Sequence, residues 1–268
     1  FKFIHQLPWV IVSMKKISWY YKSIIFYLKK KTNIDKDTFN SDSLNELFNY
    51  YGSDKGTEVN HPYDKKGDKI IGHGFGKYYE KYFREFKNEK FNFLEIGIWK
   101  GASLAAFKKY LTNANIHGID RNYKLQFKSD KIKFYNCDTT NLDDLKNLEK
   151  KFKNIKFKII IDDGSHFLND IIHNLKFFFK FLDNGGIYVI EDFKHPEHFK
   201  YLNDTDNKEL NITEIIHKFN TKEIFSSKLL TEEDQLFLMK NIKIISTYKG
   251  TMINKNINLS DIAFFKKI

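Results

Sequence analysis

Short apolar runs alternate with amphipathic segments between about residue 90 and residue 192. The apolar runs have the length of buried strands and lie at 91–97, 115–120, 132–138, 157–163 and 186–192. The segments between them, at 101–111, 141–152 and 166–182, carry apolar residues at helical spacing. A repeated strand, helix, strand order predicts a mostly parallel sheet with helices on both faces. The predicted fold class is therefore α/β.

The flanking regions read differently. After residue 192 the pattern predicts a loop, then helices at 211–219 and 231–240, and last two strands, "IKIISTYKG" and "SDIAFFKK". These strands are predicted to form an antiparallel hairpin at the edge of the sheet. Residues 1–88 are predicted to form an N-terminal helical extension with a long glycine-rich loop at 51–76, between helices at 43–51 and 77–87. A loop of that length often serves as a lid, so we divide the chain into this extension and an α/β domain at 89–268.

Composition limits the classes of partner. The net charge of +11 would suit nucleic acid or an anionic membrane. Of the 45 basic residues only Arg84 and Arg121 are arginine, the side chain that most often reads bases and phosphates. We therefore expect no specific nucleic-acid site and at most a peripheral membrane contact. The single cysteine, Cys137, excludes an intrachain disulfide and favours a reducing, cytoplasmic location. No apolar run is long enough to span a membrane, and the N-terminal residues lack a signal-peptide pattern.

Acidic residues end every one of the five predicted strands. They are Glu95, Asp120, Asp138, Asp162, Asp163, Glu191 and Asp192. One acid at a strand end most often caps the next helix. Acids at five successive ends would instead line a crevice, because ligands of open α/β sheets bind beyond the carboxyl ends of the strands. Such a crevice favours a ligand rich in hydroxyls and amines, or a cation.

The first turn, "EIGIWKGAS", indicates a nucleoside ligand. A dinucleotide-binding turn needs G-x-G-x-x-G, and Trp99 stands where the second glycine should be. This disfavours a nicotinamide dehydrogenase and suits a nucleoside without a pyrophosphate, such as S-adenosylmethionine. Asp120, 23 residues after Gly97, is placed to take both ribose hydroxyls. Glu95 would attract the cationic end of such a donor.

Three further acids suggest a metal site. Asp163 is followed 28 residues later by Glu191 and Asp192, and consecutive strands of a parallel sheet usually lie side by side. Three carboxylates brought together would repel one another, and a divalent cation would relieve the repulsion. Oxygen ligands without cysteine favour Mg²⁺, with Mn²⁺ also suitable. The alternative is that Asp163 caps the following helix while Glu191 and Asp192 pair with lysines.

His166 is the candidate general base. It lies three residues after Asp163, at the predicted start of a helix. A lone histidine is more often a packing or capping residue. Beside a metal and a methyl donor, neutral His166 could take the proton of a substrate hydroxyl. His195 and His198, in "HPEH", follow the predicted metal ligands and are interpreted as loop residues that could touch substrate, with exposed surface residues as the favoured interpretation.

Together these motifs resemble a known family. "FLEIGIWKGASL", "IHGID", "IIIDDGSH" and "GGIYVIED" are similar to the metal-dependent sugar O-methyltransferases that act on macrolide deoxysugars and glycans. The upstream motifs "YGSDKG" and "HGFGKYYE" resemble that family's G-T-D-K-G and H-G-Y-x-x-x-Y-E, with Ser53 for threonine and Phe75 for tyrosine. The resemblance covers roughly residues 50–192. It implies a Rossmann-like, S-adenosylmethionine-dependent methyltransferase fold.

The resemblance also assigns roles to residues. It implies Asp163, Glu191 and Asp192 as metal ligands, with His166 as base beside Asp163. The residues implied for the methyl donor are Glu95, Gly97, Ser103, Asp120, Asp138 and Asp162. Those implied for the substrate or the lid are Lys55, His73 and Tyr79.

The expected activity is O-methylation of a sugar hydroxyl with S-adenosylmethionine and Mg²⁺ or Mn²⁺. The expected acceptor is a nucleotide-activated or glycan-precursor sugar of surface polysaccharide (capsule) biosynthesis, with lysines near the mouth holding its phosphates. The resemblance also implies a homo-oligomer. One alternative is a methyltransferase for a small phosphorus- or carboxylate-bearing metabolite. The other is a non-catalytic, lysine-rich protein that docks on membranes or nucleic acid.

Overall fold

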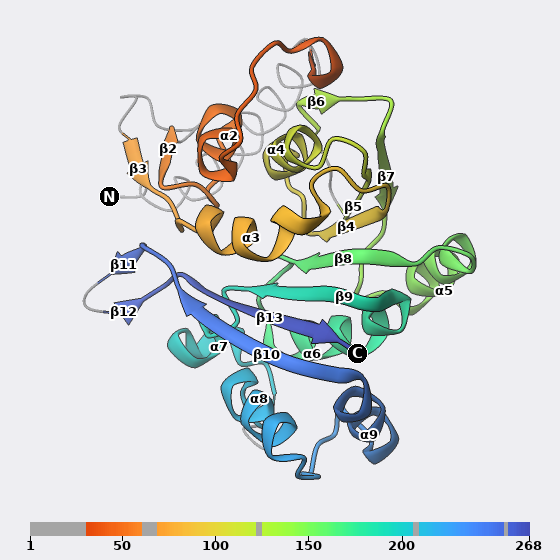
Figure 1. The fold of residues 1–268 in the computed structure, drawn as a ribbon. Helices are drawn as coiled ribbons and strands as arrows, with labels where there is room; N and C mark the ends of the chain where they lie inside the picture. Colours follow the sequence, from red (N-terminus) through yellow and green to blue (C-terminus); the bar gives the residue numbers. More distant parts are fainter. Residues whose placement is uncertain (1–30, 61–68, 122–124, 206–208, 255–256) are drawn as a thin grey trace, which may run out of the picture.

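The computed structural model describes residues 31–60, 69–121, 125–205, 209–254 and 257–268 (Figure 1). Residues 1–30 of the predicted extension and 61–68 of the predicted lid loop lie outside this part of the chain. In the described residues no helix has both the length and the apolar character to cross a bilayer.

A seven-stranded sheet forms the centre of the molecule, in the order β10-β13-β9-β8-β4-β5-β7 (Figure 1). Its strands are β4 (Asn92–Ile96), β5 (Asn115–Asp120), β7 (Ile132–Asn136), β8 (Phe157–Asp162), β9 (Leu182–Glu191), β10 (Ile242–Lys249) and β13 (Asp261–Lys267). Strands β7, β5, β4, β8 and β9 are parallel, and β13 is antiparallel to both β9 and β10. The predicted mostly parallel sheet with an antiparallel edge is confirmed. In this hairpin β10 is the outermost strand of the sheet and β13 pairs with β9.

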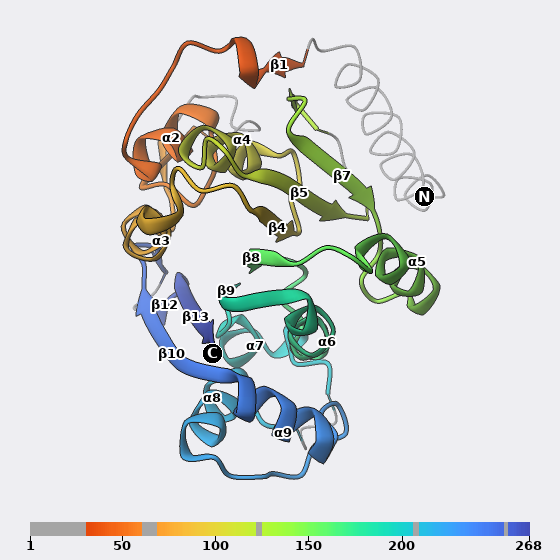
Figure 2. The same cartoon turned by 45° about the vertical axis from the view of Figure 1, so that its right-hand side comes forward.

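Helices cover both faces of the sheet (Figures 1 and 2). One face carries α2 (Leu44–Tyr51), α3 (Gly76–Phe83) and α4 (Ala102–Tyr110), and the other carries α5 (Leu142–Phe152), α6 (Leu168–Phe178), α8 (Ile212–Thr221) and α9 (Glu232–Asn241). The alternation of side chains along a strand produces these two cores. In β8, Ile159 and Ile161 pack on the α4 side, whereas Ile160 packs on the α6 side.

Two boundaries differ from the prediction because of local backbone conformation. Helix α6 begins at Leu168, not at His166, which has a left-handed φ of 59° that an L-residue inside a helix does not adopt. Its N-cap is Phe167, so Asp163 does not cap it. After β9 the predicted loop contains a short helix, α7 (His195–His198).

The predicted lid loop contains a hairpin of β2 (Glu58–Asn60) and β3 (Lys69–Ile71). At its base, the N–H of His73 donates to the carbonyl of Asp54 over 2.7 Å, and that of Phe75 donates to the carbonyl of Lys55 over 2.9 Å. These bonds hold Lys55 and His73 side by side, and both side chains are buried over the sheet. Two further pairs of short strands are β1 (Thr32–Asn33) with β6 (Phe127–Lys128), and β11 (Ile253–Asn254) with β12 (Ile257–Asn258).

Candidate active site

The carboxyl ends of β4 and β8 meet at Gly97. The N–H of Asp163 donates to the carbonyl of Ile96 over 2.9 Å. Gly97 has a φ of +81°, and a Cβ at this position would lie 1.9 Å from the carbonyl oxygen of Asp163. Only glycine allows the two strand ends to come this close. The contact therefore places Asp163 directly beside the first turn.

A cleft of about 160 Å³ opens on the other side of this turn. Gly97, Asp120 and Asp138 line it, above apolar surface from Ile96 and Ile119. Three of the residues predicted to bind the methyl donor thus share one cleft. Apolar walls with a few placed oxygens suit a nucleoside, whose base packs on the wall while its hydroxyls need acceptors.

Trp99 and Thr140 fix the two carboxylates of the cleft. The backbone N–H of Trp99 donates to Oδ2 of Asp120 over 2.8 Å, while the Trp99 side chain is 54% exposed. Trp99, expected only to obstruct a pyrophosphate, therefore also orients Asp120. Oδ1 of Asp138 accepts from the hydroxyl of Thr140 over 2.7 Å and from its backbone N–H over 3.0 Å, and these bonds lower the pKa of Asp138.

Glu95, two residues before Gly97 on β4, is fully buried. The hydroxyl of Ser103, in the first turn of α4, donates to Oε2 of Glu95 over 2.8 Å. Burial raises the pKa of Glu95 to about 7, with Lys55 acting in the opposite sense. The structure thus brings together these two predicted donor residues.

Asp162 does not line the cleft. Its carboxyl group is buried on the α6 side, where it accepts from Nδ2 of Asn174 over 3.2 Å and from the hydroxyl of Tyr188 over 3.4 Å. Successive residues of a strand point to opposite faces, which sends Asp162 away from the site and Asp163 into it. The part that Asp162 plays here is to pack and hydrogen-bond inside the fold.

Asp162→Asn should become more stable relative to the wild type as the pH rises. Burial raises the pKa of Asp162 to about 7, so the wild type loses stability between about pH 4 and 7, where this carboxyl ionises in the unfolded chain but stays protonated in the folded protein. The uncharged amide can accept from Asn174 through its oxygen and donate to the Tyr188 hydroxyl through its nitrogen. The difference in free energy of unfolding between the variant and the wild type should grow by up to about 1.4 kcal/mol per pH unit in that window. Urea unfolding at pH 5 and pH 8 measures it, with the exposed Asp143→Asn as control. A gap that does not depend on pH would contradict this account.

Lys55 lies among three carboxylates. Its ammonium nitrogen is 2.9 Å from Oε1 of Glu191 and 3.5 Å from Oε1 of Glu95, and it also donates a hydrogen bond to Oδ2 of Asp163. Burial disfavours the charged amine, but the three carboxylates outweigh burial and raise the pKa of Lys55 well above its usual value. The carboxylate oxygens of Glu95, Asp163 and Glu191 lie within 4.8 Å of one another. Their convergence creates a position that attracts a cation.

The other two predicted lid residues also reach the strand ends. The hydroxyl of Tyr79, on α3, donates to Oε1 of Glu191, and both groups are buried. Nδ1 of His73 is 3.2 Å from Oδ1 of Asp192. Although burial opposes it, the Asp192 carboxylate raises the pKa of His73 to about 9. Lys55, His73 and Tyr79 thus each contact an acid expected to ligate metal.

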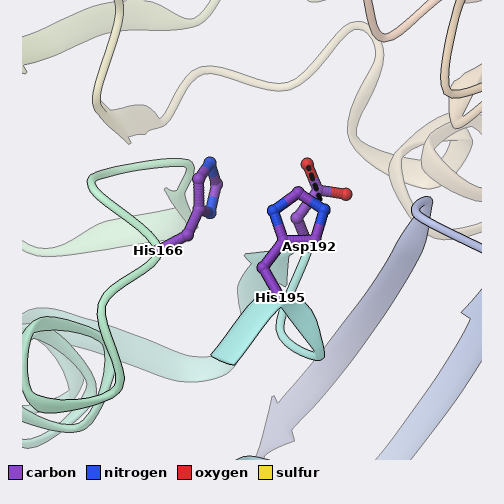
Figure 3. Close-up of side chains that lie close together, drawn as sticks. All are labelled: His166, Asp192 and His195. Carbon is purple, nitrogen blue, oxygen red and sulfur yellow. Dashed lines mark ion pairs between the residues drawn. The ribbon is translucent and has the colours of Figure 1, made fainter. Parts of the chain in front are cut away.

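His166, Asp192 and His195 form a neighbouring cluster (Figure 3). Nε2 of His166 is 3.6 Å from Oδ1 of Asp163, so His166 stands between the two groups of acids. Nε2 of His195 is 3.9 Å from Oδ2 of Asp192. Burial lowers the pKa of His195, which keeps its ring neutral. His166 and Asp192 both have a left-handed backbone, with φ of 59° and 51°. Strained backbone of this kind tends to cluster at functional sites.

The insertion of β13 into the sheet supports this cluster. Asp261, the first residue of β13, accepts the N–H of Asp192 on its carbonyl over 2.6 Å and the N–H of Lys194 on Oδ1 over 2.8 Å. These bonds hold the turn that joins β9 to α7. The sequence pattern did not single out Asp261, because its pairing with β9 is non-local.

The three predicted metal ligands therefore divide between two positions. Asp163 and Glu191 contact the same lysine ammonium, as in the alternative in which acids pair with lysines, whereas Asp192 lies among histidines. Glu95 was assigned to the methyl donor, but it lies with the acids around Lys55. His195, for which an exposed loop position was favoured over a contact with substrate, lies beside Asp192 and His166. Its position three residues after Asp192, in "EDFKH", was the only available signal.

Comparison with known proteins places this site in context. No family model matches the chain. The chain is 30% identical to the mycinamicin VI 2''-O-methyltransferase of Micromonospora griseorubida over 127 residues, which is 45% of this chain and 31% of that protein. It is 33% identical to the demethylmacrocin O-methyltransferase of Streptomyces fradiae over 127 residues, 45% of this chain and 32% of that protein. The chain thus spans about a third of the length of these relatives. They bear out the family resemblance inferred from the motifs.

Solved structures show the same fold. The MycE methyltransferase of the mycinamycin biosynthetic pathway, solved in complex with Mg and SAH, superposes with a TM-score of 0.60 at 22% identity. The match covers 86% of this chain and 55% of that one. A second structure of that protein, with Mg, SAH and mycinamycin VI, gives a TM-score of 0.61 at 21% identity, over 85% of this chain and 55% of that one. The chain therefore has a Rossmann-like methyltransferase fold, as expected from the sequence.

Proposed function

We propose that this chain is an S-adenosylmethionine- and divalent-metal-dependent O-methyltransferase that methylates a sugar hydroxyl. The observation that carries the proposal is the contact at Gly97. It places a cleft containing Asp120 next to a cluster of carboxylates that already attracts a cation. The similarity to named sugar O-methyltransferases, and to a structure that contains Mg and SAH, supports both halves of the site.

The residues of the cleft fit the methyl donor. Asp120, oriented by the backbone of Trp99, would accept the ribose hydroxyls. Asp138 would flank the adenine, and Gly97 would let the donor approach the backbone of the first turn. Glu95, held by Ser103, would supply negative charge beneath the cationic part of the donor.

The acids and His166 fit a metal-assisted transfer to oxygen. When bound, the donor and the ion supply a transferable methyl group and a positive charge that acidifies the acceptor hydroxyl. Asp163, Glu191 and Asp192 would hold the ion, and an all-oxygen set favours Mg²⁺, with Mn²⁺ also suitable. His166 would accept the hydroxyl proton. Asp163, 3.6 Å from its ring, would orient the imidazole. Lys55, His73 and Tyr79 would close the site from the lid side and exclude water.

The acceptor is the finer part of the proposal. We favour a nucleotide-activated or glycan-precursor sugar, whereas the names of the relatives specify mycinamicin VI and a rhamnosyl tetracenomycin-C. The test is incubation with labelled methyl donor and a panel of nucleotide sugars, glycosylated macrolides and small phosphorylated or carboxylated metabolites, with Mg²⁺ or with EDTA. Methyl transfer to a sugar hydroxyl that stops in EDTA is the expected result. Transfer to the small anions alone would replace the sugar assignment.

Light scattering on the same sample tests the proposed homo-oligomer.

Asp120→Ala should weaken donor binding by about 1.5–3 kcal/mol, because hydrogen bonds to a charged acceptor are lost. Calorimetric titration with S-adenosylhomocysteine measures the change. Asp130→Ala is a suitable control, because this aspartate is exposed and does not line the cleft. Wild-type affinity in Asp120→Ala would remove the ribose role from this residue.

A further inference from the structure

Asp170 is a third aspartate that lines the donor cleft, together with Asp120 and Asp138. It lies in the first turn of α6, which follows β8, whereas Asp120 ends β5 and Asp138 follows β7. In the sheet β4 lies between β8 and β5, and Ile96 and Gly97 at its end also line the cleft. The carboxylates of the cleft therefore come from both sides of β4, so a nucleoside that lies over β4 can meet an acceptor on each side.

Ser165 orients the carboxylate of Asp170. The hydroxyl of Ser165, which also lines the cleft, accepts the backbone N–H of Phe167 over 3.4 Å and donates to Oδ2 of Asp170. Among the described residues no other hydrogen bond or ion pair reaches this carboxylate. Oδ1 of Asp170 therefore keeps its lone pairs for a ligand of the cleft. The side chain is half-buried, so its position is defined and a ligand can still reach it.

Asp138 is less available as an acceptor than Asp170. Its Oδ1 already accepts two hydrogen bonds from Thr140, and its Oδ2 is 3.9 Å from a guanidinium nitrogen of Arg121. A carboxylate oxygen has two lone pairs, so Oδ1 of Asp138 is saturated and Oδ2 is shared with a cation. Asp138 can flank a base, but it has little capacity left to bind a further N–H group.

The methyl donor presents one group that suits Asp170. In the proposed function Asp120 accepts the ribose hydroxyls, and Glu95 lies near the cationic part of the donor. The donor group that remains is the exocyclic amine of adenine, which is at the end of the purine farthest from the ribose. A base whose ribose is held at Asp120, after β5, therefore directs its amine to a different part of the cleft. A carboxylate accepts from such an amine, but it repels the carbonyl oxygen that a 6-oxopurine has in the same place.

We propose that Asp170 determines the base specificity of the donor cleft by accepting a hydrogen bond from the exocyclic amine of adenine. The inference rests on the proposed function, because it takes S-adenosylmethionine as the ligand of the cleft. Ser165 is the positioning residue, since its hydroxyl holds Oδ2 and leaves Oδ1 to the ligand. A site that is built to bind an N–H group rejects an analogue without it, because its own acceptor is then left unpaired.

The test is calorimetric titration with S-adenosylhomocysteine and with S-inosylhomocysteine, in which a carbonyl oxygen replaces the amine. The wild type should bind the adenine compound about 10- to 100-fold more tightly, the range for a hydrogen bond to a charged acceptor. Asp170→Asn should reduce this ratio of affinities at least about tenfold, because the amide can donate to the carbonyl oxygen. Asp143→Asn is the matched control. Asp143 also lies in the first turn of a helix, α5, but it does not line the cleft, so the ratio should not change.

Circular dichroism shows whether Asp170→Asn folds, and Ser165→Ala repeats the test because it releases the carboxylate without removing it. Ser165→Ala should lower the ratio in the same direction. A wild-type ratio in folded Asp170→Asn would overturn the proposal, and so would an equal loss of affinity for both compounds, which is the result for a residue that only stabilises α6. If the wild type bound neither compound, the donor site itself would fail. Tight binding with an unchanged ratio would remove only the role of Asp170.

Discussion

His166→Ala should lower the rate of methyl transfer by about 10² to 10⁴, the usual contribution of a general base. The ring lies 3.6 Å from Asp163 and is about a quarter exposed, so an acceptor can reach it. Its left-handed backbone is held by the tight loop between β8 and α6, and alanine leaves that loop with the same strain but without the imidazole. Single-turnover kinetics with saturating donor and Mg²⁺ measure the chemical step directly.

His198→Ala is the control for this experiment, because it removes an imidazole from α7 without touching the acids. Calorimetry should show that His166→Ala binds S-adenosylhomocysteine like the wild type, since His166 does not line the donor cleft. An unchanged single-turnover rate would leave His166 only a structural role in the loop before α6. Loss of donor binding in this variant would instead point to a distorted strand end at Gly97.

Much of the fold could be predicted because its signals are local. The alternation of apolar runs and amphipathic helices predicts β4, β5, β7, β8 and β9 and the helices α4, α5 and α6 within a few residues. The capping box at Thr231 marks the start of α9 in the same way. The position of β13 could not be predicted. The segment "SDIAFFKK" contains no signal that distinguishes a strand paired with β10 alone from one paired with both β10 and β9. Non-local pairing is decided by the whole sheet.

The candidate site shows the same division. The cleft around Asp120 follows from the rule that ligands bind at the carboxyl ends of parallel strands. The position of Lys55 does not follow from any such rule, since it is 108 residues from Asp163 in the sequence and is held there by backbone hydrogen bonds between the segment of Asp54 and Lys55 and that of His73 and Phe75. The histidine cluster was missed for a related reason. Whether His195 faces Asp192 or solvent depends on a turn held by Asp261, which belongs to a distant strand.

The two positions for positive charge are linked through His166. On one side, Asp163 shares the Lys55 ammonium with Glu95 and Glu191; on the other, Asp192 lies between His73 and His195. An ion at the first position and the ammonium of Lys55 serve the same carboxylates. Binding of the ion and retention of Lys55 among these acids should therefore oppose each other.

Lys55→Met should accordingly lower the free energy of unfolding by about 3–5 kcal/mol in metal-free buffer, the usual effect of removing one partner from a buried ion pair. Methionine fills much of the space of the lysine stem, so the loss reflects the charge more than a cavity. The carboxylates of Glu95, Asp163 and Glu191 would be left without their cation. Added Mg²⁺ should restore more stability to this variant than to the wild type, because a ligand that binds the folded state stabilises it by an amount that grows with the logarithm of its affinity. Urea unfolding in EDTA and in Mg²⁺ measures both effects.

Lys146→Met is the matched control, since the ion pair of Lys146 with Asp143 is exposed to solvent and its loss should change stability little. Wild-type stability of Lys55→Met in EDTA would mean that the ammonium does not neutralise these acids. If Mg²⁺ stabilised the wild type and Lys55→Met equally, the ion would bind elsewhere and would not compete with Lys55. A large loss in EDTA that Mg²⁺ reverses selectively is the result expected if a divalent cation replaces the lysine during the catalytic cycle.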